Sequence, residues 1–190
     1  MLNIVIFGAP GSGKGTQSDK LIDHYHLFHI STGDVLRDNI RRGTELGQIA
    51  KGFIDQGQLV PDELINDILA QVLDENKDKA TEGVIFDGFP RTIPQAEALE
   101  QLLADRGTQI DAVVGLEVPE EELIRRILLR GQLSGRADDN EDTARKRLEV
   151  YHNQTSPLKA FYQEQGKYRA INGLGSIDDI FELIKEALDA

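Results

Sequence analysis

Cysteine and tryptophan are absent from this chain of 190 residues, and methionine occurs once. Without cysteine the protein can form neither a disulfide nor a thiolate metal site, which is typical of a reducing compartment, so we expect a cytoplasmic location. No apolar run approaches the roughly 20 residues that span a bilayer, and residues 2–7 lack the order of a secretory signal. We therefore expect no membrane partner.

Basic residues are also scarce, because 21 Lys and Arg stand against 33 Asp and Glu and give a net charge of −12. A chain this acidic lacks the positive field that nucleic acid binding requires, so we expect no nucleic acid partner. If its ligands are polyanions, its few cations must gather at one place. The positions of the arginines are therefore especially informative.

Strand and helix signals alternate along the chain. Apolar runs rich in β-branched residues predict strands at residues 2–7, 27–30, 84–86, 112–117 and, more weakly, 168–171. Helical patterns fall at residues 14–25, 34–41, 46–56, 62–73, 94–106, 120–130, 142–165 and 177–188. This alternation predicts an α/β fold of three layers, a five-stranded parallel sheet with helices on both faces.

Two segments depart from the alternation. Residues 31–60 hold short helices with no strand between them, which predicts a small helical lobe beside the sheet. Residues 131–140 are polar and punctuated by glycine, which predicts a short loop between two helices. We expect one domain, divided into a core at residues 1–30, 61–129 and 137–190, a lobe at 31–60 and a short lid at 130–136.

A glycine-rich segment, residues 8–16 (GAPGSGKGT), joins the first predicted strand to the first predicted helix. Its glycines let backbone N–H groups curl around a phosphate chain, while the helix N-terminus and Lys14 supply positive charge. Gly15 occupies the place where Ser or Thr usually binds magnesium, and Thr16 follows one residue later. We therefore expect the metal to be held mainly through water. The loop predicts a phosphate-transfer enzyme.

A second group of polar residues follows the strand predicted at 84–86. Asp87 ends that strand on the side of a parallel sheet where ligands bind, and a carboxylate there can hold a water of Mg²⁺. Arg91 ends the turn at residues 88–91 (GFPR), and its planar guanidinium suits phosphate. Gln95 offers an amide donor and an amide acceptor, enough to recognise the edge of a base.

Several cations could neutralise two nucleotides and a transferring phosphoryl group, namely Lys14, Arg37, Arg91, Arg126, Arg130, Arg136 and Arg145. Arg126 and Arg130 are four residues apart, so they share a helix face. We expect Arg125 and Arg147 at the surface.

Two other classes of nucleotide-binding protein remain as alternatives. A dinucleotide-binding protein would need a third glycine in the G-x-G-x-x-G pattern, where Thr16 stands instead. A GTP-dependent binding switch would need an N-K-x-D element, and the nearest stretch, residues 76–79 (NKDK), ends in lysine. NAD binding would favour the first class, and slow hydrolysis without an acceptor would favour the second.

Four segments together resemble the adenylate kinase family, in one order along the chain: residues 8–17 (GAPGSGKGTQ), 29–37 (HISTGDVLR), 86–96 (FDGFPRTIPQA) and 135–152 (GRADDNEDTARKRLEVYH). The resemblance covers essentially the whole chain. It implies reversible phosphoryl transfer from ATP to AMP, giving two ADP, with Mg²⁺ as cofactor. It also implies a lobe for the nucleoside monophosphate (NMP) and a lid. We expect a monomer.

The resemblance implies roles for individual residues. The ATP site would comprise Gly11, Ser12, Gly13, Lys14, Gly15, Thr16, Arg126, Arg130 and Gly175. The AMP site would comprise Thr32, Arg37, Gln58, Leu59, Val60, Gly88, Phe89, Pro90, Arg91, Gln95, Arg136 and Arg145. The residues that act in transfer would be Lys14, Arg91, Arg126, Arg130, Arg136 and Arg145, and the waters of Mg²⁺ would be held by Asp34 and Asp87.

The lid departs from the form found in many bacterial relatives, which carry a long lid, sometimes with a four-cysteine zinc site. Here five residues separate Arg130 from Arg136, and cysteine is absent. The chain therefore resembles the short-lid form, without zinc. The alternative within the class is a UMP/CMP-type kinase, which tends to carry a small residue in place of Thr32. Thr32 and Gln95 favour AMP.

Overall fold

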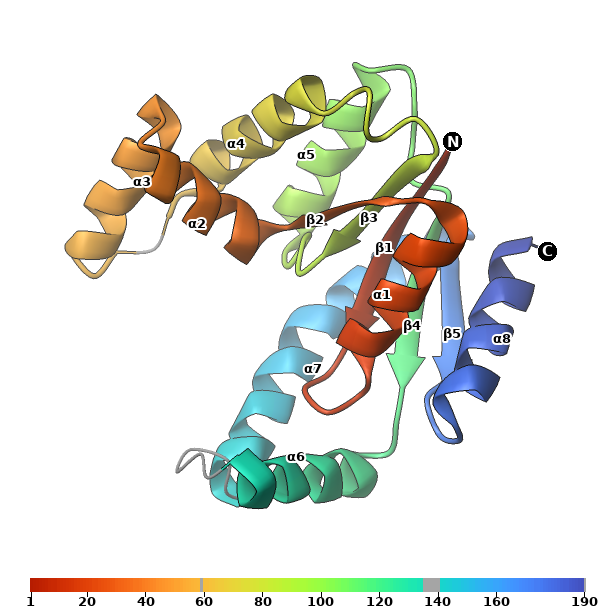
Figure 1. The fold of residues 1–190 in the computed structure, drawn as a ribbon. Coiled ribbons are helices and arrows are strands. Elements are labelled where there is room, and N and C mark those ends of the chain that lie inside the picture. The colour runs from red at the N-terminus through yellow and green to blue at the C-terminus, as the bar shows by residue number, and fades with distance from the viewer. Residues whose placement is uncertain (59, 135–140, 190) are drawn as a thin grey trace.

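A parallel sheet forms the middle layer of the computed structural model, which describes residues 1–58, 60–134 and 141–189. Its strands are β1 (Leu2–Gly8), β2 (Phe28–Ser31), β3 (Gly83–Asp87), β4 (Ala112–Glu117) and β5 (Tyr168–Asn172), in the order β2-β3-β1-β4-β5 (Figure 1). All neighbouring strands run parallel. The fold class and the five predicted strands are confirmed. Leu59 and Arg136, two of the predicted site residues, lie outside the described part of the chain.

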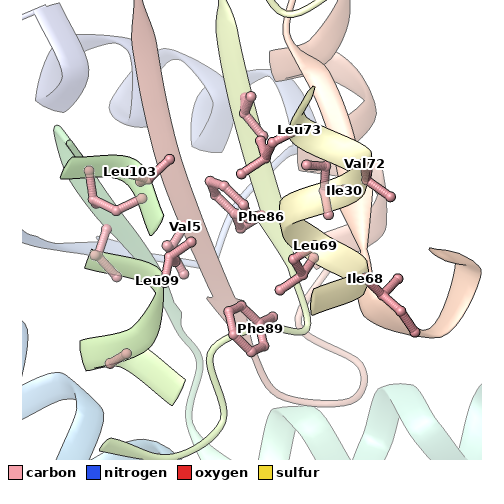
Figure 2. Close-up of a cluster of buried hydrophobic side chains, with 14 of the residues drawn as sticks. Val5, Ile30, Ile68, Leu69, Val72, Leu73, Phe86, Phe89, Leu99 and Leu103 are labelled. Atoms are coloured by element: carbon pink, nitrogen blue, oxygen red, sulfur yellow. The ribbon is translucent and has the colours of Figure 1, made fainter. Parts of the chain in front are cut away.

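One face of the sheet is covered by three helices, α4 (Asp62–Glu75), α5 (Ile93–Ala104) and α7 (Glu141–Glu164). Figure 2 shows the centre of this layer, where Val5 and Phe86 of the sheet lie between Leu69 of α4 and Leu99 of α5. Each of these side chains is at most 1% exposed. Burying one such side chain stabilises the fold by about 1.5–3 kcal/mol, so this layer holds β1 and β3 firmly in place.

The opposite face is covered by α1 (Lys14–Tyr25) and α8 (Ile177–Asp189) (Figure 1). Leu21 of α1 and Ile184 of α8 are buried against Ile4 and Ile6 of β1. Successive side chains of a strand point to opposite faces, so β1 contributes to both layers. The strand that leads into the glycine loop is therefore the most enclosed element of the sheet.

Two helices, α2 (Thr32–Arg42) and α3 (Glu45–Asp55), lie beyond the β2 edge of the sheet and beside α4 (Figure 1). They approach each other closely at Gly47, where a Cβ would lie 2.2 Å from the Asn39 carbonyl oxygen. The helices predicted in this segment are confirmed. Their role as a separate NMP-binding lobe stays a prediction.

The helix α6 (Glu120–Ser134) is longer than the sequence predicts, because it continues beyond Arg130 through Ser134. The loop predicted from residue 131 is therefore wrong at its start. Glycine in a helix costs about 1 kcal/mol, but Gly131 is buried and the helix packs on α7 through Leu123 and Leu148. None of the helices in the described ranges is both long and apolar enough to cross a membrane.

Candidate active site

The glycine loop connects β1 to α1 at the carboxyl edge of the sheet. Gly11 and Gly13 have φ angles of 84° and 89°, which residues with a side chain rarely adopt. Among the described residues, α1 has no side-chain cap at its start and no acidic residue in its first turn. Its first N–H groups and the positive end of its dipole therefore remain available to an anion.

The other residues of the loop have distinct places. Lys14 and Gly15 line the space in front of the loop. The Ser12 side chain is buried, and its backbone N–H donates to the Ala9 carbonyl at 3.0 Å, which tightens the turn. Thr16 is exposed in the first turn of α1. Backbone groups and Lys14 thus dominate the surface that a phosphate would meet.

A cavity of about 770 Å³ opens in front of this loop. Its walls come from the loop, the turn at residues 88–91 and one face of α7. Five cationic side chains line it: Lys14, Arg91, Arg130, Lys146 and Arg147. No carboxylate lines it within the described ranges. In a protein with a net charge of −12, such a concentration of cations suits a ligand with several phosphates.

Lys14, which lines this cavity, forms an ion pair with Asp87, which does not line it. Lys14 Nζ lies 2.7 Å from Asp87 Oδ1, and His29 Nε2 lies 3.2 Å from Asp87 Oδ2. The hydrogen bond with His29, together with Lys14, lowers the pKa of Asp87 to about 2. The same hydrogen bond raises the pKa of His29 above its ordinary value. Asp87 is therefore ionised near neutral pH and stabilises the charge of Lys14.

The turn at residues 88–91 joins several predicted AMP residues through hydrogen bonds. Arg91 Nε donates to the Gly88 carbonyl at 2.9 Å, and the Thr32 hydroxyl donates to the same carbonyl at 3.4 Å. Gln95 Oε1 accepts a hydrogen bond from the Arg91 backbone N–H at 2.7 Å. Side chains from α2, the turn and α5 are thereby brought together.

Phe89 and Pro90 occupy the middle of this turn. Phe89 is 1% exposed. It lies among the side chains of the main core cluster (Figure 2), whereas Pro90 lines the cavity. Anchoring Phe89 in the core fixes the turn, so Arg91 projects from a rigid support.

Asp34 and Arg37 form an ion pair on the exposed surface of α2. They line a smaller cavity of about 250 Å³ with Asp38 and Arg41. In the part of the chain that the structure describes, no group of three acidic, histidine or cysteine side chains could hold a metal ion. Arg37 pairs with Asp34, and Lys14 and His29 pair with Asp87, so an ion bound directly to either carboxylate would compete with these partners.

Arg126 ties the glycine loop to the turn after β5. Its Nη1 and Nη2 atoms donate to the carbonyls of Gly11 and Gly173, each at 3.2 Å, and its Nε donates to Glu122 at 3.0 Å. Hydrogen bonds from Arg125 and Arg126 lower the pKa of Glu122 to about 2. These contacts use the edge of the guanidinium, so its flat face is the part suited to stacking on a base.

Arg145 lies away from the cavity lining. Its side chain is 52% exposed, and its guanidinium pairs with Glu141 at 3.0 Å and with Glu120 at 3.7 Å. Both partners are exposed carboxylates at or near helix starts, where pairing is weak, so an incoming phosphate could displace them.

The remaining predicted residues are distributed around the site. Gln58 is exposed, and Val60 packs against the main core cluster. Gly175 lies in the turn before α8 with a φ of 121°. None of these three lines the large cavity in the described structure.

One face of α7 supplies cavity residues that the sequence analysis did not predict, namely Thr143, Lys146, Arg147, Val150, Tyr151, Gln154, Thr155 and Leu158. Arg147, expected at the surface, is partly exposed and also lines the cavity. Burial raises the pKa of Tyr151 to about 12, so its hydroxyl stays neutral beside the cations. These positions recur at intervals of three and four residues, a spacing that places them on one face of a helix and is visible in the sequence.

The glycine loop leads from a strand into a helix that has no side-chain cap, and it lies at the carboxyl edge of a parallel sheet beside a cationic cavity. This arrangement defines a P-loop phosphate-binding protein. The family model for adenylate kinase matches residues 6–167. An adenylate kinase of Bacteroides thetaiotaomicron is 64% identical over 189 residues, which cover 100% of this chain and 99% of the relative. Those of Porphyromonas gingivalis and Maricaulis maris are 54% and 50% identical and are covered to at least 96%. The chain therefore belongs to the adenylate kinase family, a family of nucleoside monophosphate kinases.

Proposed function

We propose that this protein catalyses reversible transfer of the γ-phosphoryl group of ATP to AMP, giving two ADP, and so balances the adenine nucleotides. The observation that supports this most directly is the cationic cavity between the glycine loop and the turn at residues 88–91. Phosphoryl transfer depends mainly on positioning and charge stabilisation, which such a cavity supplies.

ATP binds on the side of the glycine loop. The N–H groups at the start of α1 and the ammonium of Lys14 hold its phosphates, with Arg130 beside them. Arg126 stacks on its adenine, next to the turn that contains Gly175. The link from Arg126 to the Gly11 carbonyl then couples the base to the phosphate loop.

AMP binds on the side of α2 and α5. Arg91 and Arg37 hold its phosphate, while Thr32, Gln95 and the backbone near Val60 surround its base. Gln58, Leu59 and residues 88–90 complete this side. Arg136 and Arg145 clamp the phosphates as transfer proceeds, and the attacking phosphate oxygen of AMP becomes the bridging oxygen of ADP.

Magnesium enters with ATP as part of the substrate. Asp87, and Asp34 at a greater exposure, hold water molecules of the ion rather than the ion itself. When bound, Mg²⁺ neutralises charge on the β- and γ-phosphates. In the protein without nucleotide, His29 and Lys14 lower the pKa of Asp87 to about 2, so its carboxylate is charged when magnesium and ATP arrive.

Closure of two segments protects the reaction from water. The lobe at residues 31–60 folds toward AMP and the lid at 130–136 folds toward ATP, over a core formed by the rest of the chain. Exclusion of water directs the phosphoryl group to AMP instead of to hydrolysis. We also propose a monomer in the cytoplasm. The net charge of −12 disfavours nucleic acid and anionic membrane partners.

A panel of acceptors tests this function. ATP is supplied with AMP, CMP, UMP and GMP in turn, and the rate of nucleoside diphosphate formation is measured. We expect AMP to be the fastest acceptor by at least about tenfold, because a base edge read by buried hydrogen-bonding groups discriminates strongly. Fastest turnover of UMP or CMP would instead identify a pyrimidine nucleotide kinase.

A further inference from the structure

Gln95 is held at both ends of its side-chain amide. It lies at the start of α5 and is 7% exposed. Its backbone N–H donates to the Thr92 hydroxyl at 3.2 Å, and its Oε1 accepts from the Arg91 N–H at 2.7 Å. Thr92 thus caps the start of α5, and the hydrogen bond from the Arg91 N–H, one residue before the cap, fixes the carbonyl end of the amide.

The other end of the amide contacts Asp62, a residue that belongs to no motif in the sequence. Gln95 Nε2 donates to Asp62 Oδ1 at 2.7 Å, across 33 positions of the chain. Asp62 is exposed in the first turn of α4, where it also complements the helix dipole. A carboxylate can only accept hydrogen bonds and a backbone N–H can only donate, so the amide has one allowed orientation.

The remaining hydrogen-bonding capacity of the amide has a definite polarity. Nε2 keeps one further N–H, and Oε1 keeps one further lone pair. Adenine offers a donor, its 6-amino group, beside an acceptor, N1. Hypoxanthine has the same shape but offers an acceptor, O6, beside a donor, N1–H. An amide rotated by half a turn would therefore recognise the 6-oxopurine instead of adenine.

We propose that Asp62 is a positioning residue that sets the preference for adenine over 6-oxopurines, by fixing the orientation of the Gln95 amide. The inference rests on the proposed role of Gln95 in the AMP site. Asp62 reaches the base only through Gln95. Its removal therefore changes which base is accepted more than it changes the transfer step.

The variant Asp62→Asn tests this proposal, because an Asn side chain can present either a donor or an acceptor to Gln95. ATP is supplied with AMP or with inosine monophosphate, and kcat/KM is measured for each. We expect the ratio of AMP to inosine monophosphate to fall about tenfold, which matches loss of one charged hydrogen bond, mainly through a higher KM for AMP. The KM for ATP stays within about twofold.

Glu63→Gln is the matched control, since Glu63 adjoins Asp62 in the same helix turn and its removal changes the charge equally. We expect it to leave the ratio unchanged. In a Gln95→Ala background, Asp62→Asn should also leave the ratio unchanged, because the effect acts through Gln95. Asp62→Ser repeats the test if thermal unfolding shows that the Asn variant folds poorly.

Three results would overturn the proposal: an unchanged ratio in Asp62→Asn, an equal change in Glu63→Gln, or a persistent effect of Asp62→Asn without Gln95. Failure of the proposed function has a different signature. In that case the unmodified protein would form no ADP from ATP and AMP, whatever the ratio in the variants.

Discussion

Lys14 Nζ and Asp87 Oδ1 lie 2.7 Å apart, so the lysine of the glycine loop is paired with the last residue of the neighbouring strand. Asp87 is 17% exposed and is held from its other side by His29. The carboxylate therefore orients Lys14 in the cavity lining before any nucleotide arrives. A bound phosphate would compete with Asp87 for the same ammonium group.

Removing this ammonium group should abolish most of the activity while the fold survives. We expect Lys14→Ala to lower kcat by a factor on the order of 10²–10³, because one charge directed at the transferring phosphate is lost. Lys20→Ala is the control, since Lys20 lies on the same helix and pairs with Asp178 instead. ADP formation and thermal unfolding are measured together. A folded Lys14→Ala protein with near-normal activity would refute the role of Lys14.

The Asp87–His29 contact makes stability depend on pH in two separate ranges. The pKa of Asp87 falls from 3.8 to about 2 on folding, so its stabilisation is present above about pH 4 and is lost as the pH falls toward 2. The pKa of His29 is raised from 6.5, so its stabilisation is present below that value and is lost as the pH rises through the higher folded pKa.

The pH range in which His29 affects stability is the easier of the two to test. Urea unfolding at about pH 5 and about pH 8 should show a larger loss of stability for the unmodified protein than for His29→Gln, which does not titrate. His152→Gln, on the exposed surface of α7, should behave like the unmodified protein. Equal losses in all three proteins would show that the His29 contact does not contribute.

The parts of this fold that the sequence predicts are those with strong local patterns. The buried strands and the glycine loop are recognisable because hydrophobic alternation and glycine content are local properties. The extension of α6 through Gly131 was not predictable, since burial against other helices offsets a poor helix propensity. The contact between Asp62 and Gln95 spans 33 positions and has no local signature.

The site residues also divide into those predictable from local motifs and those fixed by tertiary packing. Lys14, Asp87 and Arg91 belong to short motifs at strand ends, so their convergence could be expected. Arg147 lies within the segment 135–152 but on a long helix, and whether it faces solvent or the cavity depends on how α7 is rotated against the sheet. That rotation is set by tertiary packing of Leu158 and Tyr162 in the core.

Arg126 should contribute to the binding of ATP and not to the binding of AMP. Arg126→Lys loses the planar fork whose two nitrogens donate to the Gly11 and Gly173 carbonyls, so we expect the KM for ATP to rise about tenfold with the KM for AMP nearly unchanged. Arg125→Lys is the control, because Arg125 shares the Glu122 carboxylate but is 64% exposed. Equal effects of the two substitutions would contradict the link between loop and turn.

Two glycines of α3 should respond oppositely to alanine. Gly47→Ala would place a Cβ 2.2 Å from the Asn39 carbonyl, so α2 and α3 must separate, and we expect a loss of about 1–3 kcal/mol. Gly52→Ala meets no described atom within 4 Å and should stabilise the helix by up to about 1 kcal/mol. Urea unfolding of both variants measures the difference, and a similar change in both would exclude the close packing at Gly47.

The fate of a labelled γ-phosphoryl group tests the central claim most directly. The protein is incubated with ATP labelled in its γ-phosphate, together with AMP and Mg²⁺, and the position of the label is determined. We expect the label in the β-phosphate of newly formed ADP, with two ADP produced for each AMP consumed. Label released as inorganic phosphate, at a rate independent of AMP, would contradict phosphoryl transfer to AMP.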